Sequence, residues 1–323
     1  MGLYRISFQT NCYAWVPYGY TGLYPGSGNT LDYTLRSLAQ IGYDGVEVDC
    51  LHILDTGLWK ISKTQRRMLK KSLRDLGIEV EAFSAHTWPL PDASFTSSDE
   101  ESKRLGMEWT KGIIDLAADF DTKVVTTHIP SPRKYATPSL PGMPFGILRG
   151  RGDGGRPRFE VPELSSNDEV ELMVQGVGEC ADYCSDRGVL LAIEEYAPVD
   201  FWRNFIKEVG SPALKINLHL ARVWRDMHHA NGVIEEPSLP AAVREFGSLI
   251  VHTHCMDYKT VSALPPLSSP TKRHTVEVIP GAGECDYIAF IRALKEINYT
   301  GYLTIESHRS DIPPDIQAAQ ALQ

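Results

Sequence analysis

The chain has 323 residues, of which 42% are hydrophobic and 23% charged, and its formal net charge is −9 at pH 7. This composition excludes an intrinsically disordered chain, and no apolar run approaches the ~20 residues that a membrane-spanning helix needs. Because an acidic protein repels the phosphates of nucleic acid, we expect it to act on a small polar molecule and not on a nucleic acid. The start MGLYRISFQT has no basic region followed by an apolar one, so we expect a cytoplasmic protein without a membrane partner.

Short strand-like runs alternate with helical stretches along the chain, a rhythm typical of parallel βα units. Eight runs are strand-like: Tyr4 to Thr10, Gly45 to Val48, Glu79 to Ala85, Lys123 to His128, Val189 to Glu194, Leu214 to His219, Leu249 to His254 and Tyr302 to Glu306. Eight parallel strands close a TIM barrel, which forms as one unit of ~250 residues or somewhat more. We therefore predict an α/β protein in which residues 1–323 form a single (β/α)8 barrel domain.

The segments between these runs carry the start and stop signals of helices. Three show them most clearly: Ser62 to Leu76, which ends at Gly77, Ser166 to Arg187, which ends at Gly188, and Asp286 to Ile297. The second of these carries Cys180 and Cys184. Since the six cysteines are scattered and include no C-x-x-C pair, we expect reduced structural thiols and place these two in the core.

Two long stretches lack a regular pattern. Residues 129–165 follow the fourth strand and are rich in Gly, Pro and Arg; they form either a lid or partner-binding loop, or a mobile insertion. Their basic residues bind a phosphate or a partner subunit, or belong to a solvated charged loop: Arg149, Arg151, Arg156 and Arg158. The second stretch, Tyr258 to Glu284, follows the seventh strand.

Side chains alternate in direction along a strand, so one set faces the barrel interior and the other faces the helices. Within each of the last four strands, large apolar residues occupy alternate positions and are expected to face the helices. The inward positions then fall on Glu194, Asn217, His219, His252, His254, Thr304 and Glu306. The same rule points four residues inward at the ends of the second to fourth strands: Glu47, Asp49, His86 and His128. Barrel enzymes build their active sites at this face.

Buried ionisable groups need partners, and a bound cation is one such partner. Two carboxylates and two imidazoles converge on neighbouring strand ends: Glu194, His219, His254 and Glu306. This mixed set suits a transition metal better than Mg2+ or Ca2+, which prefer oxygen ligands. We predict that these four residues bind one divalent metal ion, with Mn2+ as the first choice and Co2+, Zn2+, Fe2+ or Mg2+ as alternatives.

The chain resembles the xylose isomerase-like TIM barrel family of sugar isomerases and epimerases over nearly its whole length. Four segments carry the likeness: Ile41 to Val48, Leu191 to Pro198, His252 to Asp257 and Pro280 to Glu306. The last is the most specific, because Gly-x-Gly, a helix, Tyr-x-Gly and a strand ending in Glu form the closing unit of that family. The resemblance implies a TIM barrel with a single metal ion held by two Glu, one Asp and one His.

By this resemblance, Glu194, His254 and Glu306 match the metal ligands of the family, and Glu195 is the rival of Glu194. The sixth strand departs from the pattern. His219 stands where the family usually has Asp, and Arg222 stands where it has a further His. A neutral imidazole in place of a carboxylate leaves the bound ion a stronger Lewis acid.

The sugar enzymes of this family share the removal of a proton next to a carbonyl that the metal polarises. The resemblance therefore implies a metal-dependent isomerase or epimerase of a keto-sugar or related polyol. Glu194 and Glu306 are the predicted base and acid, and His86 and His128 are further candidates for proton transfer. The alternative is a lyase of the same family, either a dehydratase or a deglycosidase subunit that cleaves an oxidised C-glycoside. A third interpretation is a sugar-binding barrel without activity.

Four residues are expected to bind the substrate, a small carbohydrate or glycoside: Glu47, His252, Asp257 and Arg309. The outer helices and long loops leave room for a homo-oligomer or a second subunit. A DNA-repair endonuclease of this fold would need three metal ions and a basic groove, and the acidic balance argues against it.

Overall fold

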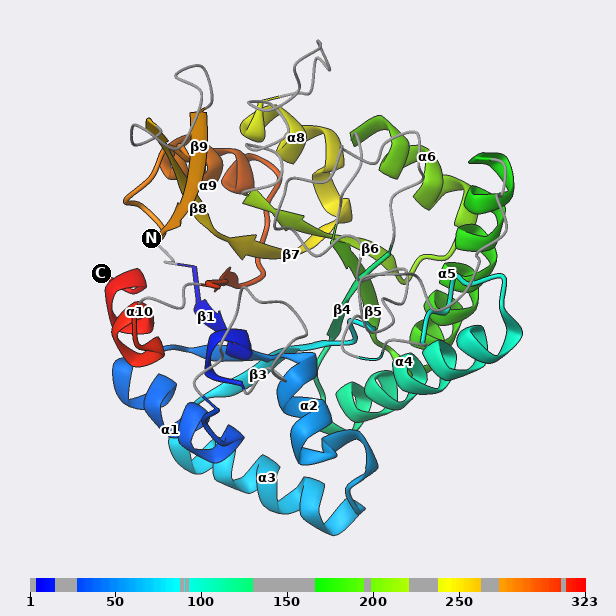
Figure 1. Cartoon of the computed structure of the whole chain (residues 1–323), viewed down its shortest axis with the longest axis horizontal. Coiled ribbons are helices and arrows are strands. Elements are labelled where there is room, and N and C mark those ends of the chain that lie inside the picture. The colour runs from blue at the N-terminus through cyan, green and yellow to red at the C-terminus, as the bar shows by residue number, and fades with distance from the viewer. Residues whose placement is uncertain are drawn as a thin grey trace.

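The computed structural model describes residues 4–14, 28–87, 90, 93–129, 166–194, 199–220, 238–262, 273–308 and 312–323. Eight parallel strands in these residues form a closed barrel, in the order β1-β10-β7-β6-β5-β4-β3-β2 (Figure 1). The strands are β1 (Ile6–Gln9), β2 (Gly45–Val48), β3 (Glu79–Ser84), β4 (Val124–His128), β5 (Leu190–Glu194), β6 (Leu214–His219), β7 (Ile250–Cys255) and β10 (Leu303–Ile305). The predicted TIM barrel is therefore confirmed.

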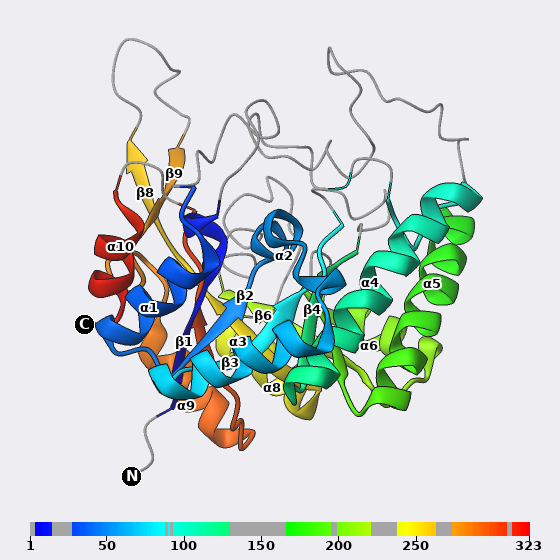
Figure 2. The same cartoon turned by 90° about the horizontal axis from the view of Figure 1, so that it is seen from below.

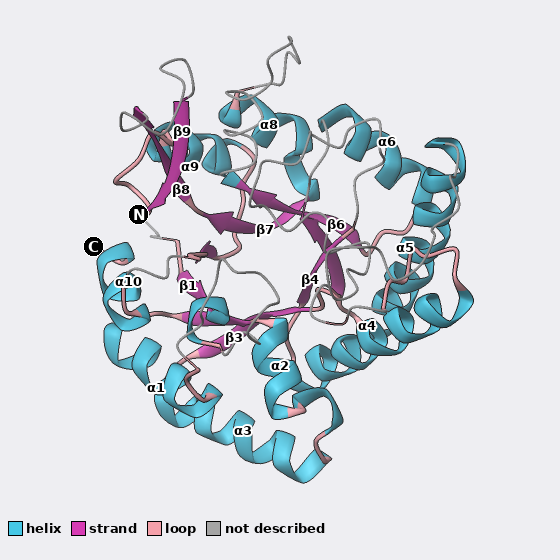
Figure 3. Cartoon of the chain, in the orientation of Figure 1, coloured by secondary structure: helices cyan, strands magenta, loops and turns pink. Residues whose placement is uncertain are grey.

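Helices surround the barrel strands on the outside (Figure 3). They are α1 (Leu31–Ile41), α2 (Cys50–Thr56), α3 (Lys63–Leu76), α4 (Glu100–Phe120), α5 (Ser166–Arg187), α6 (Val199–Val209), α8 (Leu239–Phe246), α9 (Tyr287–Glu296) and α10 (Pro314–Ala321). Among the described helices, none combines the length and the apolarity that crossing a bilayer requires.

The predicted helix signals act as local chemistry requires. Ser62 caps α3 in a capping box with Gln65, and Gly77 ends the same helix in the left-handed region at φ 70°. Asp286 caps α9 by accepting a hydrogen bond from the backbone N–H of Ala289. These side chains satisfy backbone groups that a helix end leaves free.

The main hydrophobic core lies between the barrel wall and the helices. Trp109 of α4, Trp202 of α6 and Phe290 of α9 are fully buried there. Cys180 and Cys184 on α5 are also completely buried and unpaired, which confirms their placement in the core. This packing holds the strands in a fixed ring, so that their ends converge on one face of the barrel.

The barrel wall contains two register shifts that alternation alone does not predict. Glu47 pairs with Ala82 directly after Val46 pairs with Val80, so Glu81 is an extra residue in β3. In the same way Val251 is an extra residue in β7, opposite β6. Such bulges turn side chains off the simple alternation, and Glu81 reaches the side chains of Ser7 and Thr304.

The stretch from Tyr258 to Glu284 was predicted to be irregular, and this prediction is wrong. It contains an antiparallel hairpin of β8 (Asp257–Ser262) and β9 (Arg273–Val278), which follows β7 at the C-terminal end of the barrel (Figure 2). The strands are joined by a long connection and not by a two-residue turn, so the strongest hairpin signal is missing from the sequence. Of the stretch 129–165, only Ile129 lies within the described residues, so the predictions for that loop and its arginines fall outside them.

Candidate metal centre

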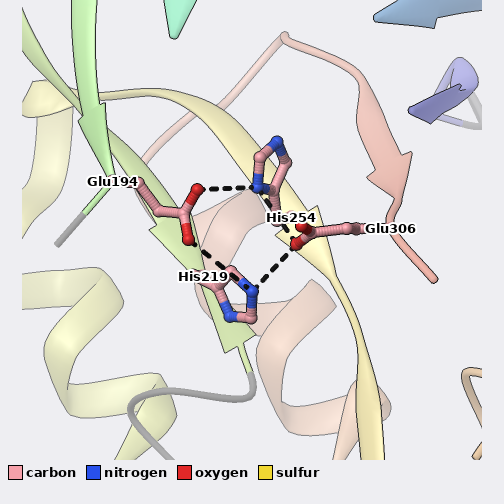
Figure 4. Close-up of side chains that lie close together, drawn as sticks. All are labelled: Glu194, His219, His254 and Glu306. Carbon is pink, nitrogen blue, oxygen red and sulfur yellow. Dashed lines mark ion pairs between the residues drawn. The ribbon is translucent and has the colours of Figure 1, made fainter. Parts of the chain in front are cut away.

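Four ionisable side chains meet at the C-terminal end of the barrel: Glu194, His219, His254 and Glu306, called here the four-residue cluster (Figure 4). Glu194 and His219 are the last residues of β5 and β6, His254 lies near the end of β7, and Glu306 directly follows β10. These four strands are consecutive neighbours in the barrel, which explains how residues over 110 positions apart come together. The sequence-predicted metal ligands are thus brought into one place.

The potential ligand atoms of the four-residue cluster all lie within 4.8 Å of one another. His219 Nε2 is 2.9 Å from Glu306 Oε2 and 3.8 Å from Glu194 Oε1. His254 Nδ1 is 3.2 Å from Glu306 Oε2 and 3.3 Å from Glu194 Oε2. With metal–ligand bonds of ~2.0–2.2 Å, ligand atoms around one ion are separated by roughly 3–4 Å, so these spacings fit one ion.

The charges of the four-residue cluster are coupled. Burial alone would raise the pKa of the Glu194 carboxyl, but His128, His254 and His219 outweigh it and hold that pKa well below its usual range. Burial likewise opposes the shift at Glu306, whose pKa is lowered by His254 and His308. The pKa of His254 is raised against the effect of burial, mainly by Glu47 and Glu306.

The charges of the four-residue cluster suit a bound metal ion. Two ionised carboxylates face two imidazoles in a buried setting, where negative charges without a cation are costly. A divalent ion at Nδ1 of His254 would take the place of the proton that the raised pKa keeps there, and its binding would release that proton. The donor set of two nitrogens and two carboxylates therefore fits a divalent transition metal.

Two further predicted residues lie beside the four-residue cluster. His128 Nε2 is 2.8 Å from Glu194 Oε2, and the His128 side chain is 17% exposed. His86 is buried, and its ring centroid lies 3.7 Å from that of His128. Burial and the neighbouring His128 lower the pKa of His86 well below its usual value, so His86 is a neutral imidazole. Their role in proton transfer stays a prediction.

The residues predicted to bind substrate have diverse positions. Glu47 and His252 lie in the barrel interior with 0% and 1% exposure, where they contact each other. Asp257 is also fully buried; its carboxylate accepts hydrogen bonds from the backbone N–H groups of Tyr258, Gly281, Gly283 and Cys285. These contacts hold the turn after β9. Arg309 and the rival ligand Glu195 lie outside the described residues.

Three residues near the site were not predicted. His308 Nε2 is 3.0 Å from Glu306 Oε1, and Glu277 on β9 accepts a hydrogen bond from the His308 backbone N–H at 2.7 Å. Glu81 contacts His252 in the interior. His308 shares the parity of Glu306, which could have indicated it. Glu277 arrives on the unpredicted hairpin, and Glu81 is turned by the bulge in β3.

Sequence comparison relates this chain to a family of TIM barrel proteins and to two sugar epimerases. A model of the family described as xylose isomerase-like TIM barrel matches residues 35–323. A D-psicose 3-epimerase from Agrobacterium fabrum is 24% identical over 285 residues, which cover 84% of this chain and 77% of the relative. A second D-psicose 3-epimerase, from Enterocloster bolteae, is 24% identical over 273 residues, covering 84% of this chain and 75% of the relative.

Solved structures share the architecture at lower identity. A D-psicose 3-epimerase determined in the presence of D-fructose superposes with a TM-score of 0.63 at 17% identity, covering 98% of this chain and 89% of that one. A 3-keto-D-glucoside 4-epimerase from E. coli has a TM-score of 0.64 at 15% identity, with 99% and 98% coverage. A Mycobacterium smegmatis barrel protein in complex with magnesium has a TM-score of 0.63 at 18% identity, with 98% and 94% coverage. These likenesses support the fold.

Proposed function

Because the chain belongs to the xylose isomerase-like TIM barrel family, we propose that it is a divalent-metal-dependent epimerase or isomerase of a keto-sugar or related polyol. The observation that carries the proposal is the four-residue cluster, whose ligand atoms converge within 4.8 Å at the end of the barrel where enzymes of this fold place their sites. The distant homology to D-psicose 3-epimerases supports the reaction class.

The bound ion would be held by Glu194, His219, His254 and Glu306, and it would supply a Lewis acid that polarises the substrate carbonyl. Mn2+ is the first choice among the ions that this donor set suits, before Co2+, Zn2+, Fe2+ and Mg2+. The substrate is a small carbohydrate or glycoside. The chain acts as one barrel domain over residues 1–323, alone, as a homo-oligomer or with a second subunit.

The proton next to the carbonyl is removed and returned by groups of this chain. Glu194 and Glu306 approach from β5 and β10, so their carboxylates can serve different faces of a substrate. His128 contacts Glu194 at 2.8 Å and can exchange a proton with it. His86, whose ring centroid lies 3.7 Å from that of His128, is the second candidate for proton transfer. Return of the proton to the opposite face gives epimerisation, and return to the neighbouring carbon gives isomerisation.

A lyase is the second candidate function, and His219 is the observation that favours it. With a neutral imidazole at this position, a bound ion would keep more positive charge than with a carboxylate and would supply stronger stabilisation of negative charge on a substrate oxygen. Elimination of water or cleavage of an oxidised glycoside would then follow proton removal. A sugar-binding barrel without activity remains the third candidate.

Metal content tests the proposed centre first. The purified protein, His219→Ala and Glu306→Ala are reconstituted with Mn2+ or Co2+, dialysed, and analysed for metal per chain, with the exposed Glu108→Ala on α4 as matched control. We expect about one ion per chain in the native protein and the control, and none in the two cluster variants. Retention of the ion by His219→Ala would remove His219 from the ligand set, and a native protein without metal would overturn the enzyme proposal.

Solvent exchange then separates the reactions. The metal-loaded protein is incubated in D2O with D-fructose, D-tagatose or a 3-keto-glucoside, and the products are followed by NMR. Deuterium next to the carbonyl of a new sugar that is an isomer of the substrate supports epimerisation or isomerisation. Release of water or of an aglycone identifies the lyase. Metal binding without exchange or product on any of these compounds would favour the sugar-binding barrel.

A further inference from the structure

A row of four charged side chains runs down the barrel interior from the proposed metal centre: His254, Glu47, His252 and Glu81, called here the buried row. Glu47 Oε2 is 2.7 Å from His254 Nε2 and 3.0 Å from His252 Nε2. On its other side, His252 Nδ1 is 3.3 Å from Glu81 Oε2. The row alternates imidazole and carboxylate, so each imidazole has a carboxylate beside it.

We infer that Glu47 is a positioning residue for the metal centre and not a substrate-binding residue. By accepting the Nε2–H of His254, it holds the ring so that Nδ1 is the nitrogen turned to Glu194 and Glu306. A hydrogen bond at one ring nitrogen decides which nitrogen is left for a metal, and it raises the basicity of that nitrogen. The inference rests on the proposed metal centre, whose ligand His254 it explains.

The surroundings of Glu47 match this role. Its side chain is 0% exposed, and both of its carboxylate oxygens are already occupied by side chains of this chain. Its second oxygen, Oε1, accepts a hydrogen bond from Thr126, which fixes the plane of the carboxylate. A buried carboxylate is costly unless hydrogen bonds and opposite charge compensate for the lost water, and His252 adds a third partner to His254 and Thr126.

The lower end of the buried row is closed by side chains of the barrel floor. Ser7 donates a hydrogen bond to Glu81 Oε1 at 2.8 Å, and Thr304 donates to the same oxygen at 3.0 Å. Glu81 reaches this place because it is the extra residue of the bulge in β3. The irregularity in the wall therefore brings a carboxylate to His252, and through His252 it supports the orientation of Glu47.

Glu47 could instead be a ligand of a second ion, because Glu47, His252 and His254 also lie within ligand distance of one another. The geometry favours positioning. Both imidazole Nε2 atoms point to the same carboxylate oxygen at hydrogen-bond distance, and His252 already has a carboxylate on each ring nitrogen. The stoichiometry of metal binding distinguishes these two arrangements.

The test is the metal affinity of Glu47→Gln, a variant of nearly equal shape whose amide oxygen can still accept one hydrogen bond. The dissociation constant for Co2+ is measured by competition with a chromophoric chelator, together with the visible spectrum of bound Co2+ and the unfolding temperature of the metal-free protein. We expect binding to weaken ~10–100-fold and the Co2+ spectrum to change, as for other residues that orient a metal ligand.

Glu277→Gln is the matched control, since Glu277 is a largely buried carboxylate close to the four-residue cluster that contacts His308 and Ser307 but not His254. It should weaken Co2+ binding far less and leave the spectrum unchanged. Equal weakening by both variants, with an unchanged spectrum, would mean that Glu47 acts only through its charge and would overturn the inference. An unchanged dissociation constant in Glu47→Gln would also overturn the inference.

Other outcomes also decide the matter. Two ions in the native protein and one in Glu47→Gln would make Glu47 a ligand and overturn positioning. If Glu47→Gln does not fold, Glu47→Asp keeps the charge but moves the oxygen, and positioning then requires weaker binding with an altered spectrum. If the native protein binds no Co2+, the result counts against the metal centre itself. If the native protein and Glu47→Gln bind one ion equally well, the result counts against the positioning role alone.

Discussion

His52 shows how a single buried side chain can make the stability of this protein depend on pH. Its Nδ1 lies 2.9 Å from the Thr10 hydroxyl and its Nε2 lies 3.1 Å from the Asn29 carbonyl oxygen, in a fully buried position. Burial lowers the pKa of His52 to about 4, so the folded protein keeps this imidazole neutral under mildly acidic conditions. An unfolded chain has no such constraint, because its histidines titrate near ~6.5.

The free energy of unfolding should therefore fall as the pH drops from ~6.5 towards 4, since the unfolded chain binds a proton there that folded His52 does not. At pH 5 the loss of unfolding free energy that His52 causes, relative to neutral pH, is about 2 kcal/mol. Urea unfolding of the wild type and of His52→Gln at pH 7 and pH 5 measures it. The variant should lose less stability between the two pH values, and equal losses would contradict the assignment.

The candidate site was predictable as far as strand alternation holds. Glu194, His219, His254 and Glu306 were found because each follows regular strand parity near a strand end, and the structure brings them together. Glu81 was missed because a bulge reverses its direction, and sequence alternation contains no signal for such a shift. The four backbone hydrogen bonds that Asp257 accepts depend on a turn after β9 that the sequence did not reveal.

At the scale of elements, α4 and α5 pack closely against the segment around Phe95. A Cβ at Gly106 of α4 would collide with the Phe95 backbone N, and a Cβ at Gly176 of α5 would collide with the Phe95 carbonyl oxygen. Only glycine allows this approach of backbone to backbone. Gly178, two residues further along α5, has its nearest neighbour at an ordinary 3.9 Å, at the Val209 side chain.

Two alanine substitutions in α5 should therefore have opposite effects. Gly176→Ala forces backbone atoms apart and should lower the free energy of unfolding by about 1–3 kcal/mol. Gly178→Ala meets no obstacle and should raise it by up to about 1 kcal/mol, because alanine favours the helix. Thermal or urea unfolding of both variants gives the comparison, and a stabilising Gly176→Ala would show that the Phe95 segment yields easily.

Element boundaries were predictable where capping chemistry is local. Ser62, Gly77 and Asp286 stand at the ends of α3 and α9 because their side chains or backbone conformation satisfy groups within a few residues. The hairpin of β8 and β9 was missed since its two strands are joined by a long connection, so their pairing is decided by tertiary contacts. Local signals thus locate helix ends better than they locate strands that pair across a long connection.

At the scale of the molecule, the barrel is closed by the pairing of β1 with β10, where Ser7 opposes Thr304 and Phe8 opposes Ile305. The count of eight strands was enough to predict this closure, because parallel βα units of that number form a barrel. The division of the chain into one domain stays a prediction. Since the proposed metal ligands come from four neighbouring strands, an ion bound there would link distant parts of the sequence.

Metal binding should accordingly stabilise the whole fold. In scanning calorimetry we expect a single unfolding transition, which moves to higher temperature with Mn2+ or Co2+ and returns after treatment with a chelator. At a free ion concentration 100 times the dissociation constant, binding should raise the free energy of unfolding by about 2.7 kcal/mol. Glu306→Ala should show no such shift. Two separate transitions, of which only one responds to metal, would contradict the expectation of a single cooperative domain.

The hairpin of β8 and β9 also bears on how such a protein can diverge. It is inserted between β7 and α9, and its base is tied by Asp257 to the turn that contains Gly281 and Gly283. Glu277 on its second strand reaches His308 beside the four-residue cluster. Because the proposed metal ligands belong to the barrel strands, recombination that exchanges the hairpin as one unit would alter the groups beside the four-residue cluster and leave the proposed ligands in place. If the proposed function holds, a new substrate specificity could evolve here by exchange of a peripheral module.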